Sequence, residues 1–298
     1  MDSPDGESFA VLAPLRALRS AALRSAAEGL HRPEGPSFDL VGLLDGKTIL
    51  VTGIANRWSI ASGIAHRLHE HGARLILTYQ GERVEDAVRE HARALGDAAL
   101  CACDVTSDTS LRALAESAGA IDGLIHSIAF VKKEDLSGKV YDTSRDGFAL
   151  AMDISAYSLI TLVGHLKDNL NDGASIAALT YLGASQIVPN YNVAGIAKAA
   201  LEASVRYLAF DLGERGIRVN AISAGPIKTA SSRQVAGFSS MPAKVAAAAP
   251  LKRGISSEDV GNCAVYLMSD LSSQVTADVH FVDGGYHAMG MYADPARP

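Results

Sequence analysis

Short apolar runs and longer amphipathic stretches alternate along the chain from about residue 46 onward. The run from Lys47 to Thr52 is apolar and β-branched and stops at a glycine, which is typical of a buried strand entering a turn. Ile60, Ile64 and Leu68 then recur at the spacing of one helix face, which predicts a helix from Ser59. The same alternation predicts further strands at 74–79, 98–103, 121–126, 173–182, 217–223 and 279–282, and helices at 82–95, 107–118, 143–170, 191–213 and 257–269.

Strands that alternate with helices form a parallel, doubly wound sheet with right-handed crossovers and helices on both faces. We therefore predict a single α/β domain of about seven strands over residues 46–298. In such sheets ligands bind beyond the carboxyl ends of the strands, near the point where the strand order reverses. The residues that follow each predicted strand are therefore the first candidates for a functional site.

Residues 1–45 do not follow this pattern, and we assign them to an N-terminal extension. Residues 11–30 are rich in Ala, Leu, Arg and Ser and have helical propensity, but Arg16 and Arg19 interrupt the apolar face. We favour a poorly ordered extension or a misassigned start. The second alternative is a helix that docks on a partner. A transit peptide for organelle import is the third alternative, and the acidic stretch Asp2 to Glu7 disfavours it.

The composition is that of an ordinary globular protein, with 48% hydrophobic and 20% charged residues. The formal net charge of −6 gives no electrostatic footprint for nucleic acid or an anionic membrane, and no apolar run is long enough to span a bilayer. Three cysteines without paired or metal-ligand spacing predict neither a disulfide framework nor a metal site. A reducing, cytoplasmic location fits this pattern best.

The first strand, its glycine and the following helix start predict an anion site. Free backbone N–H groups and the helix dipole at such a turn face bound phosphates. Gly53, Ser59 and Ile60 belong to this turn, and Ser59 can cap the helix. The match to the glycine-rich dinucleotide fingerprint is poor, because the next glycine after Gly53 is Gly63.

Polar residues also follow the next predicted strands. Gln80, Asp104, Val105 and Ser127 all fall at strand carboxyl ends, where Asp104 suits an adenine amino group and Gln80 the adenosine ribose. Gln80 and Glu82 offer an amide and an acid where a 2′-phosphate needs basic groups, so we predict NADH in preference to NADPH, although a neighbouring arginine weakens this. The alternative is that each residue only caps the next helix, Asp104 in particular.

Tyr191 and Lys198 stand seven residues apart in a predicted helix, so their side chains share one helix face. A phenol and an ammonium on one face can hold a common ligand. The phenol donates a hydrogen bond to a carbonyl that becomes an oxyanion, and the lysine binds ribose hydroxyls and favours the negative charge. Tyr181 comes ten residues before Tyr191, at a strand end that could face the same cleft. The structural alternative is that the tyrosines cap the core and the lysine is solvated.

Residues 229–248 are rich in Ser, Ala and Gly and carry Phe238 and Met241 as their main large apolar side chains. We interpret this segment as a mobile lid over an apolar substrate, with a plain surface loop as the alternative.

Several segments resemble known reductases. VNAISAGPIKT and HFVDGG are similar to the short-chain dehydrogenase/reductase superfamily. More narrowly, the chain from about Leu44 to Met289 resembles bacterial enoyl-acyl-carrier-protein reductase, through VTGIANRWSIASGIA, LTYQGER, CDV, HSIAF, DISAYS, YLGASQIVPNYNVAGIAKAALEA and SAGPIKT. The spacing of Tyr191 and Lys198 is the most specific feature, because ordinary members of the superfamily have tyrosine and lysine four residues apart, and no tyrosine here has that spacing.

The resemblance implies a Rossmann-type reductase that uses NADH to reduce trans-2-enoyl thioesters on acyl carrier protein, the last reductive step of fatty-acid elongation. It implies that Tyr191 donates a hydrogen bond to an enolate oxygen, that Lys198 binds the nicotinamide ribose, and that Tyr181 is a second active-site tyrosine. The family is usually a homotetramer, which suits the small residues around Ala200. Ala129 replaces a glycine of some members and narrows the pocket near the nicotinamide. The positions that align with cofactor contacts are Gly53, Ser59, Ile60, Gln80, Asp104, Val105, Ser127, Ile227 and Thr229.

Two rival functions remain. One is a 3-ketoacyl or other carbonyl reductase on the same fold, which the missing short tyrosine–lysine spacing disfavours. The other is a sensor that binds NADH without turnover, which the presence of both Tyr191 and Lys198 disfavours.

Overall fold

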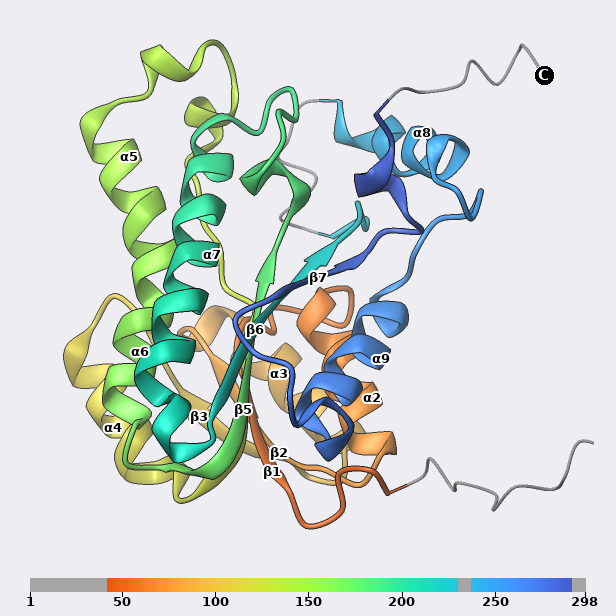
Figure 1. Cartoon of the computed structure of the whole chain (residues 1–298). Helices are drawn as coiled ribbons and strands as arrows, with labels where there is room; N and C mark the ends of the chain where they lie inside the picture. The colour runs from red at the N-terminus through yellow and green to blue at the C-terminus, as the bar shows by residue number, and fades with distance from the viewer. Residues whose placement is uncertain (1–41, 230–236, 291–298) are drawn as a thin grey trace, which may run out of the picture. The chain divides into compact units, whose positions relative to one another are not determined.

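The computed structural model describes residues 42–229 and 237–290, and these form one parallel β-sheet between two layers of helices (Figure 1). The strands pair in the order β3-β2-β1-β4-β5-β6-β7, and every neighbouring pair is parallel. The order reverses between β1 and β4, which confirms the predicted Rossmann-type doubly wound fold. The strands are β1 Thr48–Val51, β2 Arg74–Tyr79, β3 Ala99–Ala102, β4 Ile121–His126, β5 Leu170–Thr180, β6 Arg218–Ala224 and β7 Val279–Val282.

Helices cover both faces of this sheet: α2 Ile60–Glu70, α3 Glu82–Ala94, α4 Asp108–Ala118, α5 Arg145–Met152, α6 Ser158–Leu166, α7 Asn192–Leu212, α8 Met241–Ala248 and α9 Ser257–Met268. Successive strand residues point to opposite faces, and both faces are buried, so the central strands carry apolar side chains on both faces. In β1, Ile49 and Val51 pack in one core with α2, α3 and α9, whereas Leu50 packs in a second core with α4, α6 and α7. The edge of the sheet at the carboxyl ends of the strands is where the sequence predicts a ligand site.

The single helix predicted over residues 143–170 is wrong in two respects. The helix is interrupted by a π-helical turn, η3 (Asp153–Tyr157), between α5 and α6, and it ends at Leu166. Asn169 then turns the chain, because its side-chain amide donates to carbonyls at the end of α4, and Leu170 already pairs with Ile121 in the sheet. The apolar pattern runs through this turn without a break, so it could not mark the boundary.

The helical segment Arg145–Leu166 is also long and apolar enough, by length and composition, to cross a membrane. Half of its most apolar window is buried inside the protein, and its buried residues, such as Leu159 and Leu162, belong to the second core. A core helix of a globular domain gives the same signal, and this helix has that position.

The segment interpreted as a lid or loop is described only at residue 229 and from residue 237 onward; residues 230–236 lie outside the described part. The second half is not a loop: it forms the short helix η7 (Phe238–Ser240) followed by α8. Pro242 lies in the first turn of α8, where its missing N–H costs nothing. Phe238 and Val245 are both buried, so this helical segment packs on the domain.

The predicted N-terminal extension lies outside the described residues up to residue 41. Leu44, which we assigned to the extension, is fully buried in the first core, and its N–H donates to the His71 carbonyl over 2.9 Å. The folded domain therefore includes residues ahead of position 46.

Candidate active site

The strand carboxyl ends lie at one edge of the sheet, because all seven described strands are parallel. Each of the first six is followed by residues that the sequence singled out. These are Gly53 after β1, Gln80 after β2, Asp104 and Val105 after β3, Ser127 and Ala129 after β4, Tyr181 after β5, and Ile227 and Thr229 after β6. Ser59 and Ile60 lie at the start of α2, and Tyr191 and Lys198 at the start of α7.

The turn after β1 packs directly on the end of β4. Gly53 has a φ of +85°, and a Cβ atom at this position would lie 2.0 Å from the Ser127 carbonyl oxygen. Thr52 Oγ1 donates to the Ile125 carbonyl over 3.0 Å and accepts from the Ser127 N–H over 3.3 Å. Only glycine fits here, and the two strand ends form a narrow cradle of backbone groups.

Ser59 occupies the N-cap position of α2, but its side chain does not cap the helix, so that prediction is wrong. Its hydroxyl donates instead to the carbonyl of Asn56, whose oxygen also accepts the Ser59 N–H. The amino end of α2 is therefore left without a side-chain acceptor, which suits it to an anion.

Asp104 does not cap the next helix. Ser107 caps α4 by accepting from the Ser110 N–H, whereas Asp104 accepts from the N–H and the hydroxyl of Thr106 over 2.9 and 2.8 Å. These bonds, the backbone one foremost, hold the pKa of Asp104 below its usual range, and the Gln80 side chain contributes to the same lowering. Asp104 and Gln80 thus stand together as a carboxylate and an amide beyond β3 and β2.

Tyr181 and Tyr191 form an edge-to-face pair with ring centroids 4.9 Å apart. Tyr191 is the residue just before α7, so it shares a helix face with Lys198 only approximately. Burial, and then the proximity of Tyr181, raise the pKa of Tyr191 well above its usual value, so this phenol stays a hydrogen-bond donor at neutral pH. The Tyr181 hydroxyl donates to Met241 Sδ over 3.4 Å, which links the pair to the first residue of α8.

Two glycines allow the segment after β5 to pack closely against Tyr191 and α7. A Cβ atom on Gly183 would lie 2.4 Å from Tyr191 Cδ1, and one on Gly195 would lie 2.6 Å from the Gly183 carbonyl oxygen. The segment after β5 therefore lies directly against the start of α7. The sequence analysis missed Gly183, whose signal was its position two residues after Tyr181.

Lys198 is buried, with only 6% of its surface exposed. Its Nζ donates to the Leu179 carbonyl oxygen over 2.6 Å, and burial lowers its pKa to about 8. The structural alternative of a solvated lysine is therefore wrong. A lysine held at the end of β5 retains further N–H donors for a ligand.

Three polar residues that the sequence analysis did not single out support the loop after β4. His126 is fully buried, its Nε2 lies 2.8 Å from Ser158 Oγ, and burial lowers its pKa to about 3, so it is neutral. Ser155 in the π turn donates to the Phe130 carbonyl over 3.0 Å and accepts from the Phe130 N–H over 2.9 Å. The sequence indicates them only as three polar residues within segments that are otherwise apolar.

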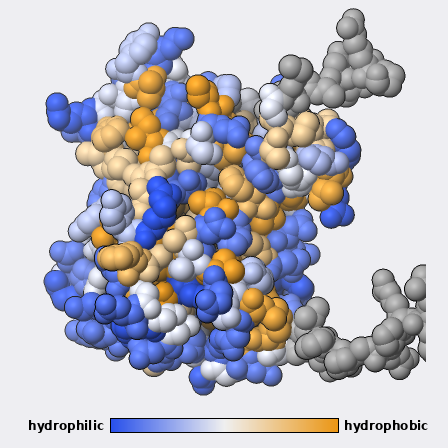
Figure 2. Space-filling model, in the orientation of Figure 1, coloured by the Kyte–Doolittle hydropathy of each residue, from blue (hydrophilic) through white to orange (hydrophobic). Residues whose placement is uncertain are grey.

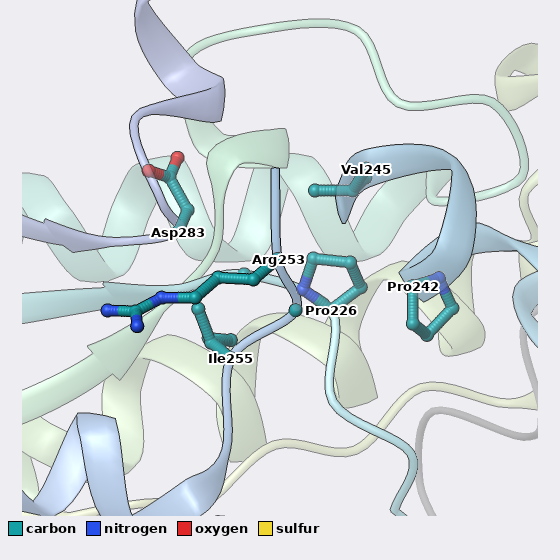
Figure 3. Close-up of a pocket in the computed structure, with 8 residues that line it drawn as sticks. Pro226, Pro242, Val245, Arg253, Ile255 and Asp283 are labelled. Atoms are coloured by element: carbon teal, nitrogen blue, oxygen red, sulfur yellow. The ribbon is translucent and has the colours of Figure 1, made fainter. Parts of the chain in front are cut away.

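A small pocket lies beside the loop after β6 (Figure 3). Pro226 from that loop, Pro242 and Val245 from α8, and Asp283 from the end of β7 help to line it. None of its lining residues is a predicted site residue, so we assign the candidate site to the tyrosine pair and the strand ends.

The chain is similar to known enoyl-acyl carrier protein reductases. The family model for enoyl-(acyl carrier protein) reductase matches residues 53–287. Enoyl-acyl-carrier-protein reductase (NADH) 1 of Rhizobium meliloti is 52% identical over 85% of this chain and 94% of its own length. The crystal structure of the Bacillus cereus enoyl-acyl carrier protein reductase with NADP+ and indole naphthyridinone is 50% identical, with a TM-score of 0.83 over 84% of this chain and 100% of its own.

A third relative was solved with a cofactor. The structure of the reductase from Anaplasma phagocytophilum in complex with NAD is 41% identical, with a TM-score of 0.81 over 85% of this chain and 98% of its own. The family model covers the described elements from α2 to β7 and every predicted site residue. The chain belongs to the enoyl-(acyl carrier protein) reductase family.

Proposed function

We propose that this protein is an enoyl-acyl-carrier-protein reductase that uses NADH to convert trans-2-enoyl thioesters to saturated acyl thioesters in fatty-acid elongation. The observation that carries this proposal is the arrangement of Tyr191 against Tyr181, beside the buried Lys198, at the ligand-binding edge of the sheet. The relatives from Rhizobium meliloti and Bacillus cereus are both named NADH enoyl-acyl-carrier-protein reductases. As a family member with this site, the protein is an oxidoreductase.

The residues at the strand ends fit a dinucleotide. The Gly53 cradle, which a Cβ atom would fill, and the uncapped amino end of α2 suit the pyrophosphate. Asp104 and Gln80 suit the adenine amino group and ribose, and among the described residues the groups that lower the pKa of Asp104 are Thr106 and Gln80, neither of them basic. When bound, NADH supplies the hydride that reaches the β-carbon of the enoyl group. Ser59, Ile60, Val105, Ser127, Ile227 and Thr229 complete the proposed cofactor site.

Tyr191 acts in this proposal as the donor to the thioester oxygen. Its raised pKa keeps the proton on the phenol while negative charge develops on the oxygen, and such a bond is worth on the order of 3 kcal/mol in the transition state. Lys198 binds the nicotinamide ribose with its remaining donors and adds a positive charge nearby. Tyr181 orients the Tyr191 ring through their edge-to-face contact. Ala129, exposed after β4, limits the pocket beside the nicotinamide.

The segment 229–248, interpreted as a lid, is the element that we expect to meet the acyl chain. The first residue of α8, Met241, contacts the Tyr181 hydroxyl and so presents an apolar side chain to the tyrosine pair. An enoyl chain carried by acyl carrier protein has the matching apolar character. We place the enzyme and its carrier in the cytoplasm.

We also propose a homotetramer. Large apolar side chains are exposed along α7, with Tyr207 at 74% and Phe210 at 83%, and Phe148, Tyr157 and Ile160 are exposed on the neighbouring α5–η3–α6 segment. Figure 2 shows apolar side chains gathered over this helical face. Patches of this kind mark interfaces, and a second copy of the chain offers the same surface in return.

The test is NADH consumption by the purified protein with a trans-2-enoyl thioester, run beside NADPH and beside a 3-ketoacyl thioester. Turnover with the enoyl substrate and NADH supports the proposal. Consumption with the ketoacyl substrate alone moves the protein to the carbonyl reductases. NADH binding without turnover of either substrate leaves a sensor and overturns the enzymatic proposal.

A further inference from the structure

Glu202 lies one helical turn after Lys198 on α7, with a half-buried side chain. Its Oε1 accepts a hydrogen bond of 2.7 Å from the hydroxyl of Thr180, which is itself buried. Lys198 in turn donates to the carbonyl of Leu179. Two residues one turn apart on α7 thus hold two consecutive residues of β5, immediately before Tyr181.

The charges around Lys198 give Glu202 a second effect. Burial disfavours the ammonium, and Glu202 is the charged group that opposes this by raising the pKa of Lys198. Burial also raises the pKa of Glu202, whereas the Thr180 hydroxyl, then Arg206 and Lys198, favour its ionised form. Half-burial makes this attraction stronger than it is between exposed charges.

The other titratable groups on the elements packed against Lys198 do not replace this charge. His126 on β4 is neutral, because burial and the proximity of Lys198 lower its pKa to about 3. Tyr191 keeps its proton, and Asp153 and Tyr157 of the π turn are exposed. Arg206, one turn beyond Glu202, is exposed and carries the same sign as Lys198.

We propose that Glu202 is a positioning residue of the reductase site: its carboxylate keeps the Lys198 ammonium charged at neutral pH and, through Thr180, fixes the strand end that carries Tyr181. The inference rests on the proposed function, because it assigns Glu202 an effect through Lys198. Glu202 has two separable effects. Its charge acts on Lys198, and its hydrogen bond with Thr180 acts on the end of β5.

Two near-isosteric variants separate these effects. Glu202→Gln removes the charge and leaves an oxygen that can accept from Thr180, whereas Thr180→Val removes the donor and leaves the charge. The measurement is the pH profile of kcat/KM, which reports groups of the free enzyme. In Glu202→Gln we expect the high-pH limb to move by at least about half a pH unit to lower pH. At a pH on that limb, kcat/KM then falls roughly threefold. In Thr180→Val the high-pH limb keeps its position while kcat falls at every pH. In Glu202→Asp, which keeps the carboxylate, the limb lies close to its wild-type position.

A structural role alone does not move the high-pH limb. If the Glu202→Gln and wild-type profiles superimpose after scaling, or if Thr180→Val shifts the limb as far as Glu202→Gln does, the proposal is overturned. NADH affinity measured against pH by fluorescence provides a readout that needs no turnover. A wild type that binds NADH but reduces no enoyl thioester overturns the proposed function instead, and the same shift in the binding profile then still tests Glu202. Circular dichroism of each variant shows that it is folded before it is compared.

Discussion

The ring of Tyr181 meets the ring of Tyr191 edge to face, with centroids 4.9 Å apart and planes inclined at 66°. The contact orders two phenols that have different surroundings. The Tyr181 hydroxyl donates to Met241 at the start of α8, whereas burial raises the pKa of Tyr191 and keeps it protonated. The two tyrosines are therefore expected to differ in function, although their rings touch where β5 ends and α7 begins.

Replacement of Tyr191 by phenylalanine is expected to lower kcat about 100-fold, because it removes one donor to a developing oxyanion, worth on the order of 3 kcal/mol. NADH affinity should change little, since the ring and its contact with Tyr181 remain. Stopped-flow NADH oxidation with a trans-2-enoyl thioester measures kcat, and fluorescence titration measures affinity. Tyr181→Phe is the matched control, with a loss of about tenfold or less. Equal losses in the two variants would contradict this division of roles.

Replacement of Gly183 by alanine is expected to displace the Tyr191 ring. The new methyl group would lie 2.4 Å from Tyr191 Cδ1 and 3.4 Å from Tyr181 Cδ1, so it would press on the Tyr191 ring where the two tyrosines meet. We expect kcat to fall by at least tenfold while far-UV circular dichroism stays that of the wild type. Gly164→Ala is the control: nothing lies within 4 Å of a Cβ there, and alanine in an exposed helix stabilises by up to about 1 kcal/mol. Wild-type activity in Gly183→Ala would show that the segment after β5 can move aside at no cost.

Much of this site follows from local sequence, and its errors have physical causes. The apolar runs of β2 and β4 predicted those strands with their bounds, because a strand buried on both faces has few alternatives, and the bounds of the edge strand β7 were also predicted. The strand ends then placed Gly53 and Asp104 at one edge. Ser59 was misassigned because the competing acceptor, the Asn56 carbonyl, exists only once the turn has formed. The Thr180–Glu202 bond joins residues 22 positions apart, and no local pattern indicates such a pair.

Lys198 is expected to reduce the stability of the cofactor-free protein. Its folded-state pKa of about 8 lies below the ordinary 10.5, so at neutral pH the fold must bury a charge, at a cost on the order of 3 kcal/mol. Lys198→Met should therefore raise the free energy of unfolding at pH 7 by up to that amount while activity is lost. Between pH 8 and 10.5 the unfolded state binds more protons than the folded state, so wild-type stability rises with pH in that window.

The difference between Lys198→Met and the wild type should accordingly narrow as the pH rises from 8 to 10.5. Urea denaturation at several pH values, without NADH, measures it. Lys167→Met, at an exposed position just beyond α6, is the matched control for the loss of a lysine side chain. A difference that stays constant across the window, or that grows, would mean that the lysine is not forced to hold its charge in the folded protein.

Phe210 offers the most direct test of the proposed subunit interface. Its side chain is 83% exposed in the isolated chain, and burial of a phenylalanine stabilises an interface by roughly 2 kcal/mol at each copy. Phe210→Glu should therefore dissociate the tetramer, as light scattering coupled to size exclusion would show. Ala87→Glu introduces the same charge at an exposed site on α3, on the opposite face of the sheet, and should leave the tetramer intact. A Phe210→Glu protein that elutes with the mass of the wild type would place the interface on another surface.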